Sequence, residues 1–207
     1  MTTKMFKRAA MVLALVGSVA APLAAQAQTT PWLVRLRAVN LDSANKDSTG
    51  LDLTINNKVI PEVDISYFFT PELAAELILT YPQKQTVRSG ASEIGTLKHL
   101  PPTLTLQYHF NGYGAFKPYL GAGVNYTHFS NVEFDPAVVT LLQPTLSKDS
   151  FGLAVQAGFD YALSNNMYLN LDVKKVQIST DVSSFGSKVG TFKVDPLLVG
   201  VGIGWRF

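Results

Sequence analysis

Few residues of this chain have the chemistry of a catalyst. Its 207 residues include three histidines and no cysteine, so it has no thiolate nucleophile, no cysteine-ligated metal and no disulfide. A hydrolase would need a histidine beside a serine and an acid. Ser130 and Ser150 lie near His128 in the sequence, but no motif brings such a set together. We therefore predict no enzymatic activity, no cofactor and no metal site.

The charged side chains follow a clearer pattern. Several stand singly within apolar stretches, at positions that alternate with large apolar residues. These are Arg35, Arg37, Asp64, Glu76, Asp160, Asp172 and Arg206. An isolated charge in an apolar interior is very costly, so these groups are expected to pair with one another. The elements that carry them must then place them on a common inner face.

Those elements are predicted to be strands. Eight stretches alternate large apolar residues with small or polar ones, which is the period-two pattern of β-structure. They cover about residues 32–40, 59–69, 72–82, 101–110, 117–129, 150–163, 167–179 and 192–207. Each has the roughly 9 to 11 residues of a tilted membrane strand, or more, whereas no apolar run after residue 30 approaches the ~18 of a membrane helix.

The connections between these stretches alternate in length. Residues 70–71, 111–116 and 164–166 are short turns, and residues 41–58, 83–100, 130–149 and 180–191 are long loops. Short turns on one side, long loops on the other and an even strand number are typical of bacterial outer-membrane barrels. A closed barrel also satisfies every backbone group in lipid. The sequence therefore predicts an all-β fold, an eight-stranded antiparallel transmembrane β-barrel of the bacterial outer membrane.

The aromatic residues distinguish this barrel from a soluble one of the lipocalin type, whose large apolar residues would point inward. Fourteen of them are expected at the end with the short turns, where they would form an interfacial girdle. They are Trp32, Tyr67, Phe68, Phe69, Tyr108, Phe110, Tyr113, Phe116, Tyr119, Phe159, Tyr161, Tyr168, Trp205 and Phe207. Alternation alone does not separate the two barrels, but the girdle favours the membrane.

The amino terminus has the organisation of a secretory signal peptide. Lys4, Lys7 and Arg8 precede an apolar core, and Ala25 and Ala27 supply the small residues before a cleavage site. Cleavage before Gln28 leaves residues 28–207 as one barrel domain. It removes three positive charges and no negative one from a chain of net charge +2, which leaves −1. Nothing in that balance suggests nucleic-acid binding.

The chain resembles the OmpW family of outer-membrane proteins, which includes the alkane-uptake protein AlkL. Residues 32–35, 64–71, 98–110, 117–127 and 194–207 carry the resemblance in order along the whole mature chain. It departs after Pro82, where the family often has a histidine and this chain has Gln83, Lys84 and Gln85. The resemblance implies an eight-stranded barrel that admits small hydrophobic molecules. It also implies that the carboxyl-terminal Phe207 is read by the barrel-assembly machinery.

The inward positions suggest how such molecules would pass. An eight-stranded interior is just wide enough to be filled by side chains, so the charged residues above are expected to plug the lumen. The loops and upper strands supply an apolar mouth that suits a hydrophobic ligand. Its predicted residues are Val39, Leu51, Leu53, Ile55, Ile78, Leu97, Val138, Leu141, Leu142 and Leu198. The run 138–142 is either a short helix over the mouth or a patch that meets lipopolysaccharide.

If the lumen is plugged, an apolar solute must leave sideways into the bilayer. Pro61, Pro82, Pro101 and Pro102 fall near the outer ends of three adjacent strands, and each removes a backbone donor from the sheet. They mark either simple loop exits or a weakened lateral seam. We predict an uptake channel whose partners are small hydrophobic solutes, membrane lipid and lipopolysaccharide. The alternatives are a structural or receptor barrel, a water-filled ion channel and a small lipid-modifying enzyme of the outer membrane.

Overall fold

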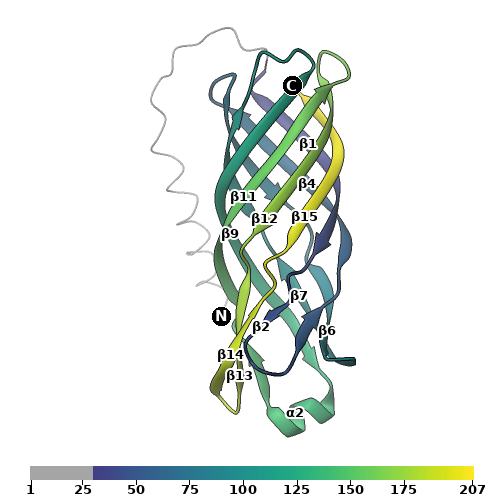
Figure 1. Cartoon of the computed structure of the whole chain (residues 1–207), viewed down its shortest axis with the longest axis vertical. Helices are drawn as coiled ribbons and strands as arrows, with labels where there is room; N and C mark the ends of the chain where they lie inside the picture. The colour runs from purple at the N-terminus through teal and green to yellow at the C-terminus, as the bar shows by residue number, and fades with distance from the viewer. Residues whose placement is uncertain (1–29) are drawn as a thin grey trace, which may run out of the picture.

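The computed structural model describes residues 30–207, and the predicted signal peptide lies outside the described residues. Eight long strands form a closed barrel (Figure 1). They are β1 (Trp32–Asp42), β4 (Lys58–Phe68), β5 (Leu73–Leu79), β8 (Thr103–His109), β9 (Phe116–Phe134), β11 (Asp149–Ala162), β12 (Met167–Val176) and β15 (Leu197–Arg206). The predicted eight-stranded antiparallel barrel is confirmed.

Each strand pairs antiparallel with its sequence neighbour in the barrel, and the last strand closes on the first. β1 pairs with β4 on one side and with β15 on the other, from Leu33 opposite Arg206 to Asp42 opposite Leu197. β9 joins β8 to β11. Both chain ends of the barrel domain lie at the end with short turns, which faces the periplasm.

Alternation along the strands separates lipid-facing from inward side chains. In β12, for example, Leu169, Leu171 and Val173 are exposed, and Asn170, Asp172 and Lys174 are buried. Exposed aromatic side chains form an inner girdle at the periplasmic end, where Trp32 and Tyr67 stack edge to face at 4.9 Å between ring centroids. Phe68, Tyr119 and Tyr168 were predicted to belong to this girdle but are buried in the lumen instead, because they occupy inward positions of their strands.

A second, outer girdle marks the other edge of the apolar surface. Tyr81, Tyr126 and Phe151 are exposed there, and Tyr126 packs against Phe151 at 4.8 Å between ring centroids. The strand rise and tilt of a barrel place Val59 about 20 Å above Tyr67, within an apolar band about 25 Å tall. The strands between the two girdles are the membrane-spanning segments.

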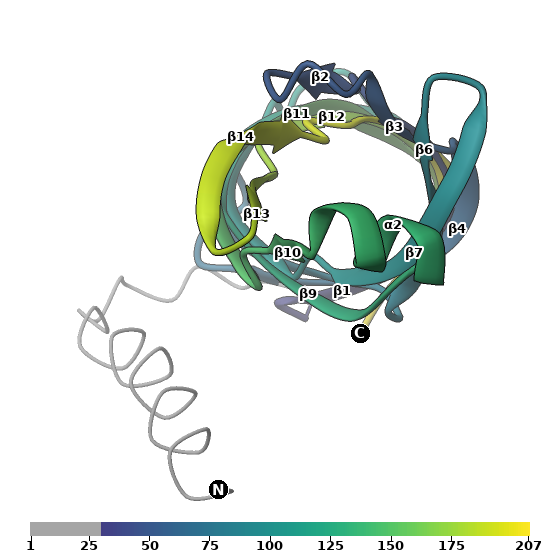
Figure 2. The ribbon, with the colours of Figure 1, turned by 90° about the horizontal axis from the view of Figure 1, so that it is seen from below.

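Beyond the outer girdle, the long connections are not loops, as predicted, but further strands that extend the wall. They comprise β2 (Lys46–Asp47), β3 (Leu53–Ile55), β6 (Gln83–Ser89), β7 (Ser92–Leu100), β10 (Pro144–Leu146), β13 (Ser179–Ser184) and β14 (Ser187–Lys193). Their many polar residues obscured the alternation. A short helix, α2 (Pro136–Leu142), lies at this end of the barrel (Figure 2). In residues 30–207 no helix has the length and hydrophobicity to cross a membrane.

Candidate functional site

The lumen is crossed near its periplasmic half by a network of buried ion pairs, here called the floor. Arg35 on β1 is fully buried. Its guanidinium contacts both carboxylate oxygens of Asp160, at 3.0 and 2.6 Å, and donates to Glu76 Oε1 at 2.9 Å and Ser66 Oγ at 2.8 Å. These partners come from β11, β5 and β4, so a single side chain links three sides of the barrel.

Arg37 extends the floor one layer outward. It contacts Asp64 Oδ2 at 2.8 Å and Glu62 Oε1 at 3.2 Å, and its Nε donates to Asn170 Oδ1 at 2.7 Å. Lys174 then joins Glu62 at 2.5 Å and Asp172 at 3.2 Å. All these charged side chains are buried and in mutual contact. The floor therefore fills the lumen with paired charge.

Small residues make room for these long side chains. Gly158 faces Tyr119, and a Cβ added at Gly158 would lie 2.5 Å from the tyrosine hydroxyl, which itself donates to Asp172 at 2.8 Å. A Cβ at Gly202 would lie 2.8 Å from Cγ of Arg37. Glycine at these inward positions is thus a packing requirement of the floor, because neither site has space for a methyl group.

The structure places six of the seven predicted plug residues together: Arg35, Arg37, Asp64, Glu76, Asp160 and Asp172. Arg206, the seventh, follows the inward alternation of β15 but makes no ion pair with the others in the described structure. It stacks on Phe68 at 4.2 Å and donates to the Thr30 carbonyl at 3.1 Å, at the periplasmic end of the barrel. Glu62 and Lys174 were not among the predicted plug residues, and their ion pair forms the top of the floor.

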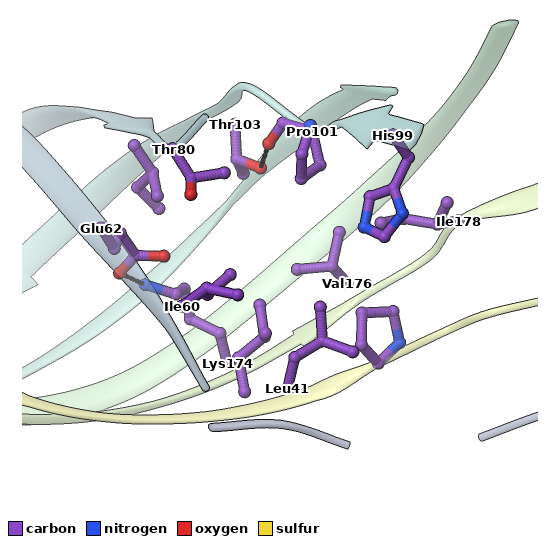
Figure 3. Close-up of a pocket in the computed structure, with 13 residues that line it drawn as sticks. Leu41, Ile60, Glu62, Thr80, His99, Pro101, Thr103, Lys174, Val176 and Ile178 are labelled. Atoms are coloured by element: carbon purple, nitrogen blue, oxygen red, sulfur yellow. Dashed lines mark hydrogen bonds and ion pairs between the residues drawn. The ribbon is translucent and has the colours of Figure 1, made fainter. Parts of the chain in front are cut away.

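A small lower cavity of about 20 Å³ lies directly above this ion pair. Its wall is mainly apolar and includes Leu41, Ile60, Ile78, Val176, Ile178 and Leu198, with Glu62, Lys174, Thr80, Thr103 and His99 as its polar members. Figure 3 shows the Glu62 and Lys174 pair at one end of the view and His99 at the other. The predicted mouth residues Ile78 and Leu198 lie in this cavity, and Val39 is buried in the apolar cluster around it.

A small upper cavity of about 40 Å³ lies between the extracellular strands and α2. The predicted mouth residues Leu51, Leu53, Ile55, Leu97, Val138 and Leu142 line it. Leu141 of the predicted mouth does not line this cavity, and its side chain is 70% exposed. Four further lining residues were not predicted. Val87, Phe134 and Val182 lie in segments that were expected to be loops, and Phe192 is the first residue of a predicted strand.

The wall beside the lower cavity contains a break in strand pairing, here called the breach. The pairing of β4 with β5 ends at Val63 opposite Leu79. Farther from the periplasm, β3, which precedes β4 in the chain, pairs with β6, which follows β5, and this pairing begins at Ile55 opposite Val87. Both pairings share one register. No strand pairing joins residues 56–62 to residues 80–86 in the described structure, although the two segments run side by side.

Side chains carry the contacts that do cross the breach. Thr80 Oγ1 donates to the carbonyl of Pro61 at 2.7 Å, and the amide of Thr86 donates to Asn56 Oδ1 at 2.7 Å. Pro61 and Pro82 lack the backbone donors that regular pairing needs here. The segment Thr80–Pro82 pairs with neither adjacent strand among the described residues, so no strand ladder holds it in the wall.

Pro101 and Pro102 lie at a different junction, where the wall is tied. The Asn125 side chain donates to both of their carbonyls at 3.2 Å, and the amide of Tyr126 donates to Pro102 O at 3.1 Å. Strand pairing with β9 continues on either side of them in one register. The four prolines of the predicted seam therefore have different surroundings, and only Pro61 and Pro82 border the breach.

His99 is a buried histidine above the outer girdle. Its ring is fully buried, 6.2 Å from the ring of Phe129, and neither ring nitrogen has a hydrogen-bond partner among the described residues. Burial, together with the nearby positive charge of Lys58, lowers the pKa of His99 to about 4. At neutral pH the imidazole is therefore uncharged, with one donor nitrogen and one acceptor nitrogen.

This histidine should make the stability of the barrel pH-dependent. The unfolded chain binds a proton at His99 below pH about 6.5, whereas the folded chain does not until about pH 4, so acidification across that window favours unfolding. We expect a loss of about 3 kcal/mol between pH 7 and pH 4 from this one group. Urea unfolding of wild type and His99→Phe in detergent measures it as the difference between the two pH profiles. Parallel profiles would contradict the assignment.

The exposed histidine belongs to a surface contact. His128 Nδ1 lies 2.9 Å from Asp149 Oδ1, and both side chains are more than 40% exposed. Ser130 and Ser150, the candidate nucleophiles in the sequence, make no hydrogen bond to His128 within residues 30–207. The geometry needed for a serine hydrolase is not assembled there.

Comparison with known proteins identifies the relatives of this barrel. A family model described as the OmpW family matches residues 27–207. The chain is 42% identical over 189 residues to the uncharacterized outer-membrane protein y4mB of Sinorhizobium fredii, covering 86% of this chain and 80% of that protein. It is 30% identical over 178 residues to outer membrane protein W of Vibrio cholerae, covering 80% and 82%.

Among solved structures, the crystal structure of OprG from Pseudomonas aeruginosa resembles the barrel with a TM-score of 0.74 and 27% identity, covering 86% of this chain and 96% of that one. The family match spans all the described residues, and the relatives are outer-membrane proteins with the same fold. The resemblance found in the sequence is confirmed, and the chain belongs to the OmpW family of bacterial outer-membrane proteins.

Proposed function

We propose that this protein is an uptake channel for small hydrophobic molecules. A solute enters the upper cavity from outside the cell, moves to the lower cavity and leaves through the breach into the outer leaflet of the membrane. The two cavities are small, about 20 and 40 Å³, so the surrounding side chains must move apart to admit a solute. Their apolar walls then supply an environment that suits hydrophobic ligands. In this proposal the floor blocks direct passage to the periplasm.

The breach is the single observation that carries this proposal. Thr80 lines the lower cavity and also makes the side-chain contact to Pro61 across the breach. Moving residues 80–82 therefore breaks a few side-chain contacts but no strand ladder. Tyr81 of the outer girdle belongs to the same segment, so the opening lies at the edge of the hydrocarbon, where an apolar solute can enter lipid directly.

The floor makes the alternative route through the lumen unfavourable. A hydrophobic solute passing downward would have to separate Lys174 from Glu62 and Arg37 from Asp64, and would leave buried charges without partners. Breaking a buried pair by loss of one partner costs about 3 to 5 kcal/mol. Lateral exit avoids this cost because the ion pairs stay closed.

Replacing Pro61 and Pro82 together by Thr tests the exit. Threonine restores both backbone donors and favours strands, so the breach should gain pairing and uptake should fall about tenfold, while the barrel stays folded. Pro118→Thr is the matched control, because it adds a donor to β9 near the inner girdle, opposite Phe159. Cells that express each variant are compared for uptake of labelled naphthalene, with folding checked by heat-modifiable gel mobility.

Cells without the protein provide the baseline. If naphthalene enters at the same rate with and without it, the channel function is wrong, and a structural or receptor role gains support. If wild type accelerates uptake and the double variant matches it, lateral exit at the breach is wrong. Contact with lipopolysaccharide at α2 and recognition of Phe207 by the assembly machinery stay predictions.

A further inference from the structure

A cluster of buried polar groups without partners lies between the two cavities. On β6 the inward side chains are Gln83, Gln85 and Val87, and on β7 they are Leu97 and His99. Gln83 pairs in register with His99, and Gln85 with Leu97. Val87 and Leu97 line the upper cavity and His99 lines the lower one. The polar groups therefore lie on the wall that a solute passes between the cavities.

Their hydrogen-bonding capacity is unused within the described chain. Both ring nitrogens of His99, both amide atoms of Gln85 and Oε1 of Gln83 have no partner. Gln83 is held in place by its Nε2, which donates to Thr80 Oγ1 at 3.0 Å and to the Tyr81 carbonyl at 2.8 Å. Buried polar groups in proteins are nearly always paired. His99 lines the lower cavity, and Gln83 and Gln85 lie beside it on the wall between the two cavities without lining either one. A few polar groups beside a mainly apolar cavity have the composition of a recognition site.

We propose that His99 and Gln85, with Gln83, bind the hydroxyl group of a neutral amphiphile, so that the preferred solutes are hydrophobic molecules with one hydroxyl, such as phenols and alcohols. This proposal rests on the channel function proposed above and names its substrate class. A hydroxyl both donates and accepts one hydrogen bond. The neutral imidazole and the amide likewise offer donors and acceptors.

Charge in the lower cavity argues against a carboxylate as the ligand group. Glu62 lines this cavity, and its partner Lys174 is already engaged at 2.5 Å. An added anion would find no free cation at this ion pair and would meet apolar walls from Val176 and Ile178, where an unpaired charge is costly. A neutral hydroxyl requires no counter-ion.

The position of His99 relative to the breach adds a reason for this chemistry. His99, Thr80 and Pro101 line the same lower cavity, and His99 lies above the outer girdle. A hydroxyl held there would stay at the level of the lipid headgroups while the apolar part of the molecule enters the outer leaflet through the breach. An amphiphile in a bilayer also has its hydroxyl at the headgroups and its apolar part in the hydrocarbon, so it would leave the site in the orientation that it keeps in the membrane.

Paired probes that differ by one hydroxyl test the proposal. Binding and uptake of 1-naphthol and of naphthalene are measured with wild type, His99→Phe, Gln85→Leu and the double variant. The double variant should lose about tenfold in affinity for 1-naphthol, as expected for lost hydrogen bonds to buried partners, while naphthalene binding stays within about twofold. Lys84→Ala is the matched control, because Lys84 lies on the same strand and faces outward.

A spectroscopic readout separates recognition from a packing effect. In nanodiscs with labelled histidine, the imidazole nitrogen resonances of His99 should shift on addition of 1-naphthol and stay in place with naphthalene. If naphthalene is taken up but the preference for 1-naphthol is the same in all variants, hydroxyl recognition is wrong and the channel stands. If neither probe enters faster than in cells without the protein, the channel itself fails.

Discussion

Replacing Arg35 by Leu should destabilise the barrel by about 3 to 5 kcal/mol, the usual consequence of removing one partner from a buried ion pair. The change leaves the Asp160 carboxylate with Asn170, at 2.8 Å, as its remaining side-chain partner among the described residues. Glu76 keeps hydrogen bonds from Gln107 and Gln156 at 2.7 and 2.8 Å. Most of the lost stability is therefore expected from the Asp160 carboxylate, which is left with fewer hydrogen-bond donors. Urea unfolding in detergent at neutral pH measures the loss.

Two further variants make this result interpretable. Arg88→Leu removes an arginine whose ion pair with Glu93 is exposed and 4.0 Å long, and it should cost less than about 1 kcal/mol. The double variant Arg35→Leu, Asp160→Leu removes the orphaned carboxylate and should recover part of the stability, because apolar replacement of a buried pair is often tolerated. A single variant as stable as wild type would show that the floor contributes nothing.

Crosslinking the breach should abolish uptake of naphthalene reversibly. If the shared register of the flanking strands continued across it, Pro61 would lie opposite Tyr81, and both side chains face outward. The chain has no cysteine, so Pro61→Cys with Tyr81→Cys creates one thiol pair. Under oxidising conditions its disulfide would tie residues 80–82 to β4, and we expect uptake to fall to the level of cells without the protein.

The same double variant provides its own control after reduction. Reduction leaves both substitutions in place and removes only the crosslink, so recovery of uptake assigns the effect to movement across the breach. Each single cysteine variant should be insensitive to oxidation. Mass spectrometry after thiol blocking gives the crosslinked fraction. Full crosslinking with undiminished uptake would exclude the breach as the exit.

The membrane part of the fold was predictable because lipid imposes a strict rule on it. Between the girdles, every outward position must be apolar, so alternation in β1 and β12 defines both faces of these strands and assigns Arg35 and Asp172 to the lumen. Alternation gives the direction of a side chain but not which partners it reaches, and Arg206 contacts Phe68 and Thr30 rather than the ion pairs of the floor. Phe68 and Tyr119 were placed in the girdle on their aromatic type alone, although their strand positions point inward and their side chains are buried.

Above the membrane, the sequence carries no such constraint. Strands β6 and β7 face water on their outer side, so Lys84, Lys98 and their neighbours look like an ordinary polar loop. Gln85 and His99 are buried because β6 and β7 pair and extend the barrel wall. Their residue types alone do not indicate this burial. The break in pairing was partly visible through Pro61 and Pro82. The residues at which the pairing stops and resumes follow from the register shared by the β4–β5 and β3–β6 ladders, and that register is seen only in the structure.

The floor also determines when the barrel is complete. Arg35 and Asp160 are 125 residues apart in the chain, and they meet only when β15 docks on β1. In an unclosed sheet, Arg35 can reach Glu76 and Ser66 on nearby amino-terminal strands. Asp160 and Asn170 lie on carboxyl-terminal strands, so the two arginines of β1 cannot yet contact them. Contacts of such long range are late and slow in folding. Closing the ring of strands and pairing Arg35 with Asp160 are thus a single step. A partly assembled sheet lacks this ion pair, and the closed barrel has it.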